Sequence, residues 1–159
     1  MMVKSVVLPL DQAASFRLFT ESIGAWWPPE RRHTGDPASA IFLLADGRFY
    51  ERARDGREVE LGRVRAWQPP ARILLDFFAA TGPERPTEVE IVFALREDGT
   101  HVTVTHRPTP ASAGLWTERA PRYDLSWDIV LAALSRAAGI EFGATANSRL
   151  PALAQVKRN

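Results

Sequence analysis

Apolar and polar side chains alternate through the middle of the chain, and this two-residue period predicts β-strands. Between residues 41 and 107 the apolar runs are separated by short turn sequences. Three of these turns contain an Asp-Gly pair, namely Asp46-Gly47, Asp55-Gly56 and Asp98-Gly99. Because Asp-Gly between two apolar strands is a strong hairpin signal, we predict an antiparallel meander of about six strands.

The same alternation predicts which side chains face the interior. The odd-numbered positions from Val89 to Leu95 are apolar, whereas the even-numbered positions of this strand include two glutamates. In the next strand, Val102 and Val104 share a face with His106. Because successive side chains of a strand point to opposite faces, we expect one face of the sheet to be apolar and to include this histidine.

One predicted strand, residues 58–67, changes phase in its middle. Its apolar positions are odd-numbered up to Leu61 and even-numbered from Val64 onward, and Gly62 lies at the change. A glycine at a slip in the alternation is typical of a β-bulge, which bends a strand. We therefore expect a curved sheet.

A short strand and a helix are predicted ahead of the meander. The apolar run Val3–Leu8 reads as the strand, and Asp11 is expected to cap a helix that Gly24 ends. The sequence Trp-Trp-Pro-Pro follows at residues 26–29, and proline restricts its predecessor Trp27 to an extended conformation. Residues 31–40 are rich in turn formers, so they are interpreted as an exposed and mobile loop.

A long helix is predicted after the meander, over residues 123–139, with Gly139 at its end. Residues 109–122 are interpreted as a connection that contains no regular element. The helix carries one apolar stripe at helical spacing, made of Trp127, Val130, Leu131, Leu134 and Ala138.

Composition narrows the functional class. At 159 residues the chain is expected to form one domain, residues 1–139, followed by a partly disordered tail, residues 140–159. A formal net charge of +1 argues against a dedicated nucleic-acid-binding surface. The chain has no cysteine, which excludes disulfides and thiolate chemistry. Its apolar runs are too short to span a bilayer, so we expect no membrane insertion and a cytoplasmic location.

His106 is the candidate for chemistry. A histidine on an apolar face is either a hydrogen-bonded core residue or a ligand contact and general acid–base, and the sequence leaves both open. His33 and His101 show no ligand spacing relative to it, so no metal is expected, and the absence of phosphate-loop and nucleophile motifs predicts no cofactor.

Several charged residues of the meander are weighed as pocket groups and interpreted as solvated instead. Glu51 and Glu58 lie near strands that could face inward, but edge glutamates are usually exposed. Arg63 and Arg65 share one side of the bulged strand. If either pointed inward, it would select a ligand with an anionic group.

The order of these elements and several sequence segments resemble a known superfamily. The segments are FTESIGAWWP, PTEVEIVF, DGTHVTVTHR and WDIVLAAL. They resemble the START-like, or SRPBCC, superfamily and its branch homologous to the activator of heat-shock-protein ATPase. The resemblance implies an α+β helix-grip fold, in which a curved antiparallel sheet of six to seven strands wraps around a long C-terminal helix, with a short helical segment after the first strand. It also implies a pocket between sheet and helix, used in the superfamily for lipids, sterols, aromatic polyketides and hormones.

We therefore predict a protein that binds a hydrophobic or aromatic small molecule in an internal cavity. Two alternatives stay open: a cyclase or dehydratase that uses His106 as acid–base, and an interaction module, cochaperone-like or homodimeric, that docks through its tryptophan loop. Trp127 could be core or cavity wall, and the tandem tryptophans could be a staple or a lid. The predicted ligand-binding residues are Trp26, Trp27, Phe49, Trp67, Phe77, Phe93, His106, Trp116 and Trp127.

Overall fold

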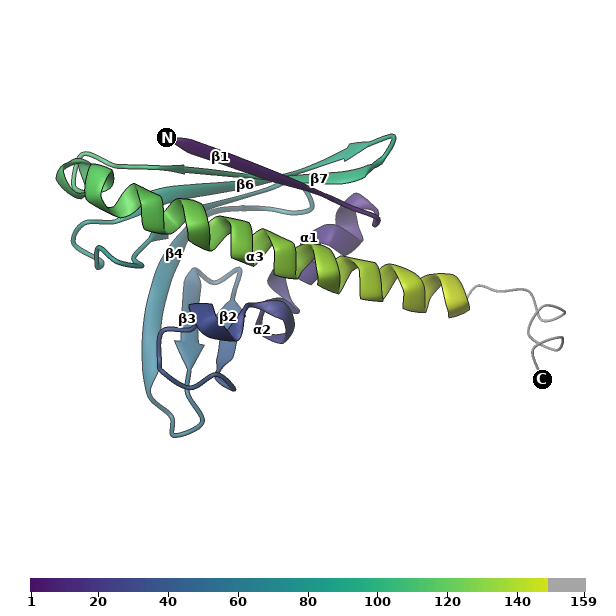
Figure 1. Ribbon diagram of the computed structural model, residues 1–159, viewed down its shortest axis with the longest axis horizontal. Helices are drawn as coiled ribbons and strands as arrows, with labels where there is room; N and C mark the ends of the chain where they lie inside the picture. The colour runs from purple at the N-terminus through teal and green to yellow at the C-terminus, as the bar shows by residue number, and fades with distance from the viewer. Residues whose placement is uncertain (149–159) are drawn as a thin grey trace, which may run out of the picture.

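Seven antiparallel strands form one curved sheet in the computed structural model of the chain, which describes residues 1–148 (Figure 1). The strand order is β1-β7-β6-β5-β4-β3-β2, so the first strand lies beside the last. The six-stranded meander and the additional first strand are therefore confirmed. The strands are β1 (Met2–Leu8), β2 (Ala40–Leu43), β3 (Arg48–Arg52), β4 (Glu58–Gln68), β5 (Arg72–Phe77), β6 (Thr87–Arg96) and β7 (Gly99–Arg107).

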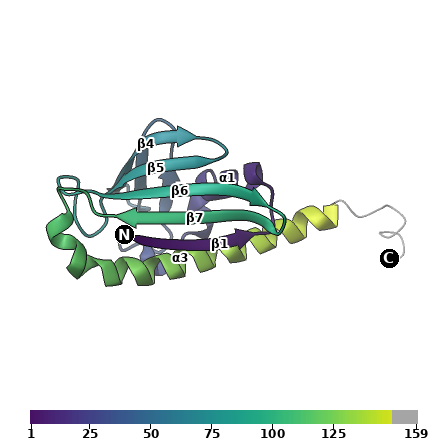
Figure 2. The ribbon, with the colours of Figure 1, turned by 90° about the horizontal axis from the view of Figure 1, so that it is seen from above.

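A long C-terminal helix runs along the sheet, as Figure 2 shows from above. Its apolar stripe joins the inward side chains of the strands in one hydrophobic core. This arrangement is the predicted α+β helix-grip fold. The helices are α1 (Gln12–Thr20), α2 (Ile23–Trp26), the short 3-10 turn η1 (Pro29–Arg31) and α3 (Ala113–Ser148).

The first helix begins as predicted but ends differently. Asp11 caps it, because its side chain accepts a hydrogen bond of 2.7 Å from the backbone N–H of Ala14. The helix stops at Thr20, and Gly24 lies inside the separate turn α2 instead of ending the run. A Cβ atom on Gly24 would lie 3.1 Å from the carbonyl oxygen of Ile41. The glycine therefore serves close approach of α2 to β2.

The predicted bounds of the last helix are wrong at both ends. It starts at Ala113 within the expected connection, contains Pro121, and continues through Gly139. Trp116 and Tyr123, on either side of the proline, both pack against the ring of His106, and these contacts outweigh the local cost of proline. The helix spans the predicted tail as far as Ser148, and the rest of that tail lies outside the described residues.

The predicted bulge in β4 is confirmed. Phe49 pairs with Gly62 and Tyr50 with Glu60, so Leu61 is the extra residue. A Cβ atom on Gly62 would lie only 2.4 Å from the carbonyl oxygen of Asp76, which explains why the position needs glycine. A second irregularity, unpredicted, follows around residue 65. Together the two bulges curve β4.

The inward and outward faces follow the predicted alternation with one exception. Val89, Val102, Val104 and His106 are buried, as expected. Leu95 is instead 56% exposed, because it lies beside the turn that joins β6 to β7, at the margin of the sheet. Among residues 1–148, no helix has the length and apolar character needed to cross a membrane.

Candidate functional site

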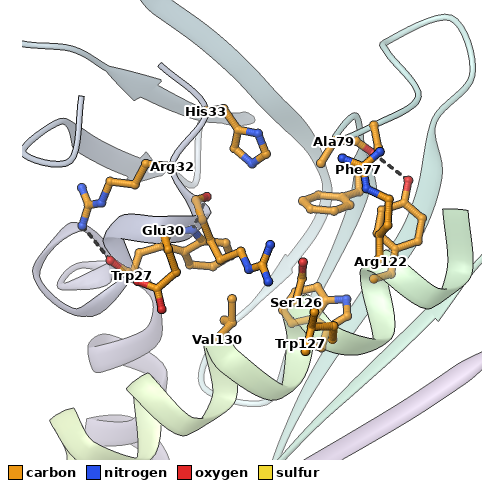
Figure 3. A pocket seen from close by; sticks show the side chains of 14 residues that line it. Trp27, Glu30, Arg32, His33, Phe77, Ala79, Arg122, Ser126, Trp127 and Val130 are labelled. Atoms are coloured by element: carbon orange, nitrogen blue, oxygen red, sulfur yellow. Dashed lines mark hydrogen bonds between the residues drawn. The ribbon is translucent and has the colours of Figure 1, made fainter. Parts of the chain in front are cut away.

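A cleft with a volume of about 520 Å³ opens at one end of the interface between the sheet and α3. It lies between the segment of residues 27–33, the chain after β5, and the first half of α3 (Figure 3). We call it the aromatic pocket and define it by six of its lining residues: Trp27, Arg31, Phe77, Arg122, Tyr123 and Trp127.

The tandem tryptophans separate at this point. Trp26 ends α2, and its indole N–H donates to the carbonyl of Leu18 at 2.8 Å inside the core. Trp27 is extended, with φ −57° and ψ 128°, as the following proline predicts. Its indole N–H donates to the carbonyl of Arg31 at 3.1 Å, and its ring faces the pocket. One tryptophan therefore stabilises the fold while its neighbour forms a wall.

The opposite wall comes from α3. Tyr123, Trp127 and Val130 recur four and three residues apart, so they share one face of the helix. The hydroxyl of Tyr123 donates to the carbonyl of Ala79 at 2.7 Å, which ties the helix to the chain after β5 (Figure 3). Burial raises the pKa of this hydroxyl, so it remains protonated at neutral pH.

His106 lies behind this wall and does not line the pocket. The indole N–H of Trp127 donates to its Nδ1 at 3.0 Å, so Nδ1 is an acceptor and the imidazole is neutral. Its protonated Nε2 then donates to the hydroxyl of Thr87 at 2.7 Å. Burial, with a smaller effect of the N-terminal charge, lowers its pKa to about 3. Both ring nitrogens are thus used, and the geometry is that of a hydrogen-bonded core residue.

The structure brings three of the nine predicted ligand-binding residues to the pocket: Trp27, Phe77 and Trp127. Phe49 and His106 lie one layer behind, in ring contact with these three. The other four do not line it. Trp116 packs on His106 near the start of α3, and the remainder belong to aromatic contacts around α1, namely Trp26, Trp67 and Phe93.

The prediction that the charged residues of the meander are solvated is wrong for Glu51. It is confirmed for Glu58, Arg63 and Arg65. Glu51 is fully buried, and its two oxygens accept bonds of 2.7 and 2.8 Å from the N–H groups of His33 and Thr34. Burial would raise its pKa, but these bonds outweigh that effect and lower it. Glu58 pairs with two arginines at the surface, and Arg63 and Arg65 are exposed. The carboxylate of Glu51 therefore anchors the end of the segment of residues 27–33, which we call the pocket segment.

A second anchor fixes the same segment. The guanidinium of Arg32 donates to the carbonyl of Trp27 at 2.8 Å (Figure 3). It also donates to the carbonyl of Gly24 at 2.9 Å and to that of Ser39. Residues 31–40, expected to be a mobile loop, thus carry a dense set of hydrogen bonds. This cross-linking was missed because Arg32 bonds to backbone carbonyls, which no side-chain pattern in the sequence indicates.

Tyr123 was also missed, although a sequence signal for it existed. It lies four residues before Trp127 and therefore extends the predicted apolar stripe by one turn. Arg31 and Arg122 gave no such signal, because nothing in a sequence distinguishes an arginine at a pocket from one at the surface. Within the described residues, no three His, Asp or Glu side chains are grouped as metal ligands would be.

Comparison with protein families gives one match over most of the chain. Residues 13–138 match the family described as Activator of Hsp90 ATPase homolog 1-like protein. No curated protein matches the chain.

Solved structures share the fold at low sequence identity. The self-sacrificing resistance protein CalC from Micromonospora echinospora is 23% identical, with a TM-score of 0.65 over 88% of this chain and 94% of that chain. An AHSA1-like protein from Aeromonas hydrophila is 20% identical, with a TM-score of 0.56 over 87% and 93%. DynU16, from the dynemicin biosynthetic locus, is 15% identical, with a TM-score of 0.55 over 85% of this chain and 45% of its own.

Proposed function

The chain belongs to the family of Activator of Hsp90 ATPase homolog 1-like proteins, and from this premise we propose that it binds an aromatic small molecule in the aromatic pocket. One observation carries the proposal: four aromatic side chains, Trp27, Phe77, Tyr123 and Trp127, converge on one cleft of about 520 Å³. Pockets that bind small molecules span roughly 300–1,000 Å³ and are lined mainly by apolar and aromatic groups.

The walls of the cleft are held in place before any ligand arrives. Trp27 and Trp127 are only 5% and 4% exposed, and their rings meet edge to face at a centroid distance of 6.5 Å. Their indole N–H groups are both used internally, so each presents mainly apolar surface to the cleft. A flat aromatic ligand would bury its faces against rigid partners and lose little affinity to ordering of the protein.

The proposal is for binding without chemical conversion. An acid–base role for His106 would require a ring nitrogen that reaches the ligand, but both nitrogens bond to Trp127 and Thr87. The names of two structural neighbours support a connection with small molecules: CalC is called a resistance protein, and DynU16 comes from a biosynthetic locus.

Native mass spectrometry of protein purified from its own cells tests the proposal, together with thermal shifts across a library of aromatic compounds. The variant Ser126→Trp places a large side chain on the pocket face of α3 and should abolish the thermal shifts. Its matched control is Ala132→Trp, on the same helix at an exposed position outside the pocket, which should leave them unchanged.

Two results would contradict the proposal. One is a clean mass without bound compound together with no thermal shift across the library. The other is an equal loss of binding in the Ser126 and Ala132 variants, because the bound compound would then lie elsewhere on the protein.

A further inference from the structure

Two arginines of the aromatic pocket have no acidic partner among the described residues. Arg31 and Arg122 both line the cleft, and neither forms an ion pair there. Arginines of the outer sheet face differ: Arg65 pairs with Asp76 and Glu88 at 2.8 and 2.6 Å. The two pocket arginines therefore present positive charge that the described part of the protein leaves unneutralised.

Arg31 shows the stronger sign of an absent partner. Its Nε–H is a buried donor, and no acceptor lies within hydrogen-bond distance of it among the described residues. Buried donors are nearly always hydrogen-bonded, because an unsatisfied one loses its hydration without compensation. A carboxylate in the cleft would neutralise the charge of the guanidinium that carries this donor.

The position of Arg31 places this charge next to the aromatic wall. Its backbone carbonyl accepts the indole N–H of Trp27, and both residues line the same cleft. A molecule that contacts the indole there would lie in the same cleft as Arg31. A planar carboxylate suits this group, since arginine can bind both of its oxygens at once.

The other charged residues of the lining do not neutralise the positive charge of Arg31 and Arg122. Glu30 is the single carboxylate of the lining, against Arg31, Arg32 and Arg122. Arg32 is committed to backbone carbonyls, and burial lowers the pKa of His33, which favours its neutral form. The lining therefore has an excess of positive charge although the whole chain is almost neutral.

We infer that the pocket selects an aromatic carboxylate, with the acid group bound by Arg31 and attracted by Arg122. The inference rests on the proposed function, because it names the chemical class of the ligand for the same site. A carboxylate on the bound molecule would neutralise part of the lining charge. A neutral aromatic molecule of the same shape would leave that charge unchanged.

Isothermal titration with two probes of equal shape tests the inference: 2-anthracenecarboxylate and 2-anthracenecarboxamide. We expect the carboxylate to bind at least about tenfold more tightly, since a charge-assisted pair is about twice as strong as a neutral hydrogen bond. Arg31→Gln should reduce this preference to about threefold or less. Arg31→Lys keeps the charge without the planar fork and should give an intermediate preference.

Two further variants keep the result independent of folding defects. Arg122→Gln changes an exposed side chain and should lower the preference by a smaller factor than Arg31→Gln. Arg63→Gln, also exposed but on β4 outside the pocket, is the matched control and should change nothing.

The outcomes separate this inference from the proposed function. Equal affinity for both probes, or a preference that survives Arg31→Gln and Arg122→Gln, overturns the inference and leaves aromatic binding standing. Failure of both probes to bind, together with a library that gives no thermal shift, overturns the proposed function and the inference with it.

Discussion

The two ends of the interface between the sheet and the helices are built from the same kinds of side chain but differ in function. At one end, which we call the packed end, Phe16, Phe19, Trp26 and Phe93 form ring contacts with centroid distances of 5.2–5.8 Å. At the other end, the rings of the aromatic pocket surround a cleft. Aromatic residue type alone therefore does not identify a binding site.

The difference arises from the segment that covers the sheet at each end. At the packed end α1 contributes two rings, Phe16 and Phe19, and both pack against Phe93 of the sheet. At the pocket end the corresponding position is taken by the segment of residues 27–33, which contributes one large ring, Trp27. Its polar side chains and backbone anchor the segment instead of filling the space. A cleft results where a loop replaces a helix.

The largest expected effect is at the packed end. Phe93→Ala should lower the free energy of unfolding by about 3–5 kcal/mol, because Phe93 is 1% exposed and its removal leaves a cavity between two other rings. Urea denaturation measures this change. Affinity of the aromatic pocket for its probes should stay the same at temperatures where the variant is folded. A loss below about 1 kcal/mol would show that the packed end is not closely packed.

An intermediate effect is expected where the pocket segment is anchored. Glu51→Gln should lower the free energy of unfolding by about 1–3 kcal/mol at neutral pH. It removes the negative charge of the carboxylate whose oxygens accept hydrogen bonds from two backbone N–H groups. The folded-state pKa of Glu51 is lowered, so its stabilisation is present above the unfolded pKa of about 4.3 and is lost as pH falls through the folded value.

Denaturation midpoints of the natural protein and the variant between pH 2 and pH 7 check this prediction. The gap between the two should narrow as pH decreases below about 4. A gap that is constant with pH would mean that the charge of Glu51 contributes nothing.

A comparison of two indoles gives a further test. Trp127→Phe leaves the Nδ1 atom of His106 buried without its donor, which should cost about 1–3 kcal/mol. Trp27→Phe removes a bond to the carbonyl of Arg31 beside the cleft, where water can replace the indole, so its cost should be smaller. Chemical denaturation of both variants gives the two values, and a larger cost for Trp27→Phe would mean that the bond from Trp127 to His106 contributes less to stability than the bond beside the cleft.

The smallest effect is expected from filling the pocket. Ser126→Trp should change the free energy of unfolding by less than about 0.5 kcal/mol, since the added ring enters space that the folded protein leaves open. Thermal denaturation without added compound measures it. A large destabilisation would mean that the cleft is too narrow for an aromatic ring.

The parts of the fold that follow from local sequence could be predicted. Alternation located the inward residues of β6 and β7, and the Asp-Gly turns located three hairpins. The phase change at Gly62 located a bulge because strand geometry makes a one-residue slip visible in sequence. The start of α3 could not be found this way, because contacts of Trp116 and Tyr123 with a distant histidine override the helix-breaking signal of Pro121.

The site was predicted less well, for a related reason. Which aromatic ring lines a cleft depends on what lies opposite it, and that is decided by contacts such as Tyr123 to Ala79, 44 residues apart. Burial of Glu51 likewise depends on two amides 17 and 18 residues earlier. The sequence pattern predicted the inward side of each strand and helix. The pocket depends on how the pocket segment, the chain after β5 and α3 lie against one another.

The pairing of β1 with β7 determines when the fold can be completed during synthesis. Leu8 lies opposite Thr100, so the first strand has to wait for a partner made 92 residues later. At a translation rate of about 5–20 residues per second, this delay is on the order of 5–20 seconds. During that time the apolar segment of β1 has no partner strand. A chaperone that holds newly made chains would find a binding site there.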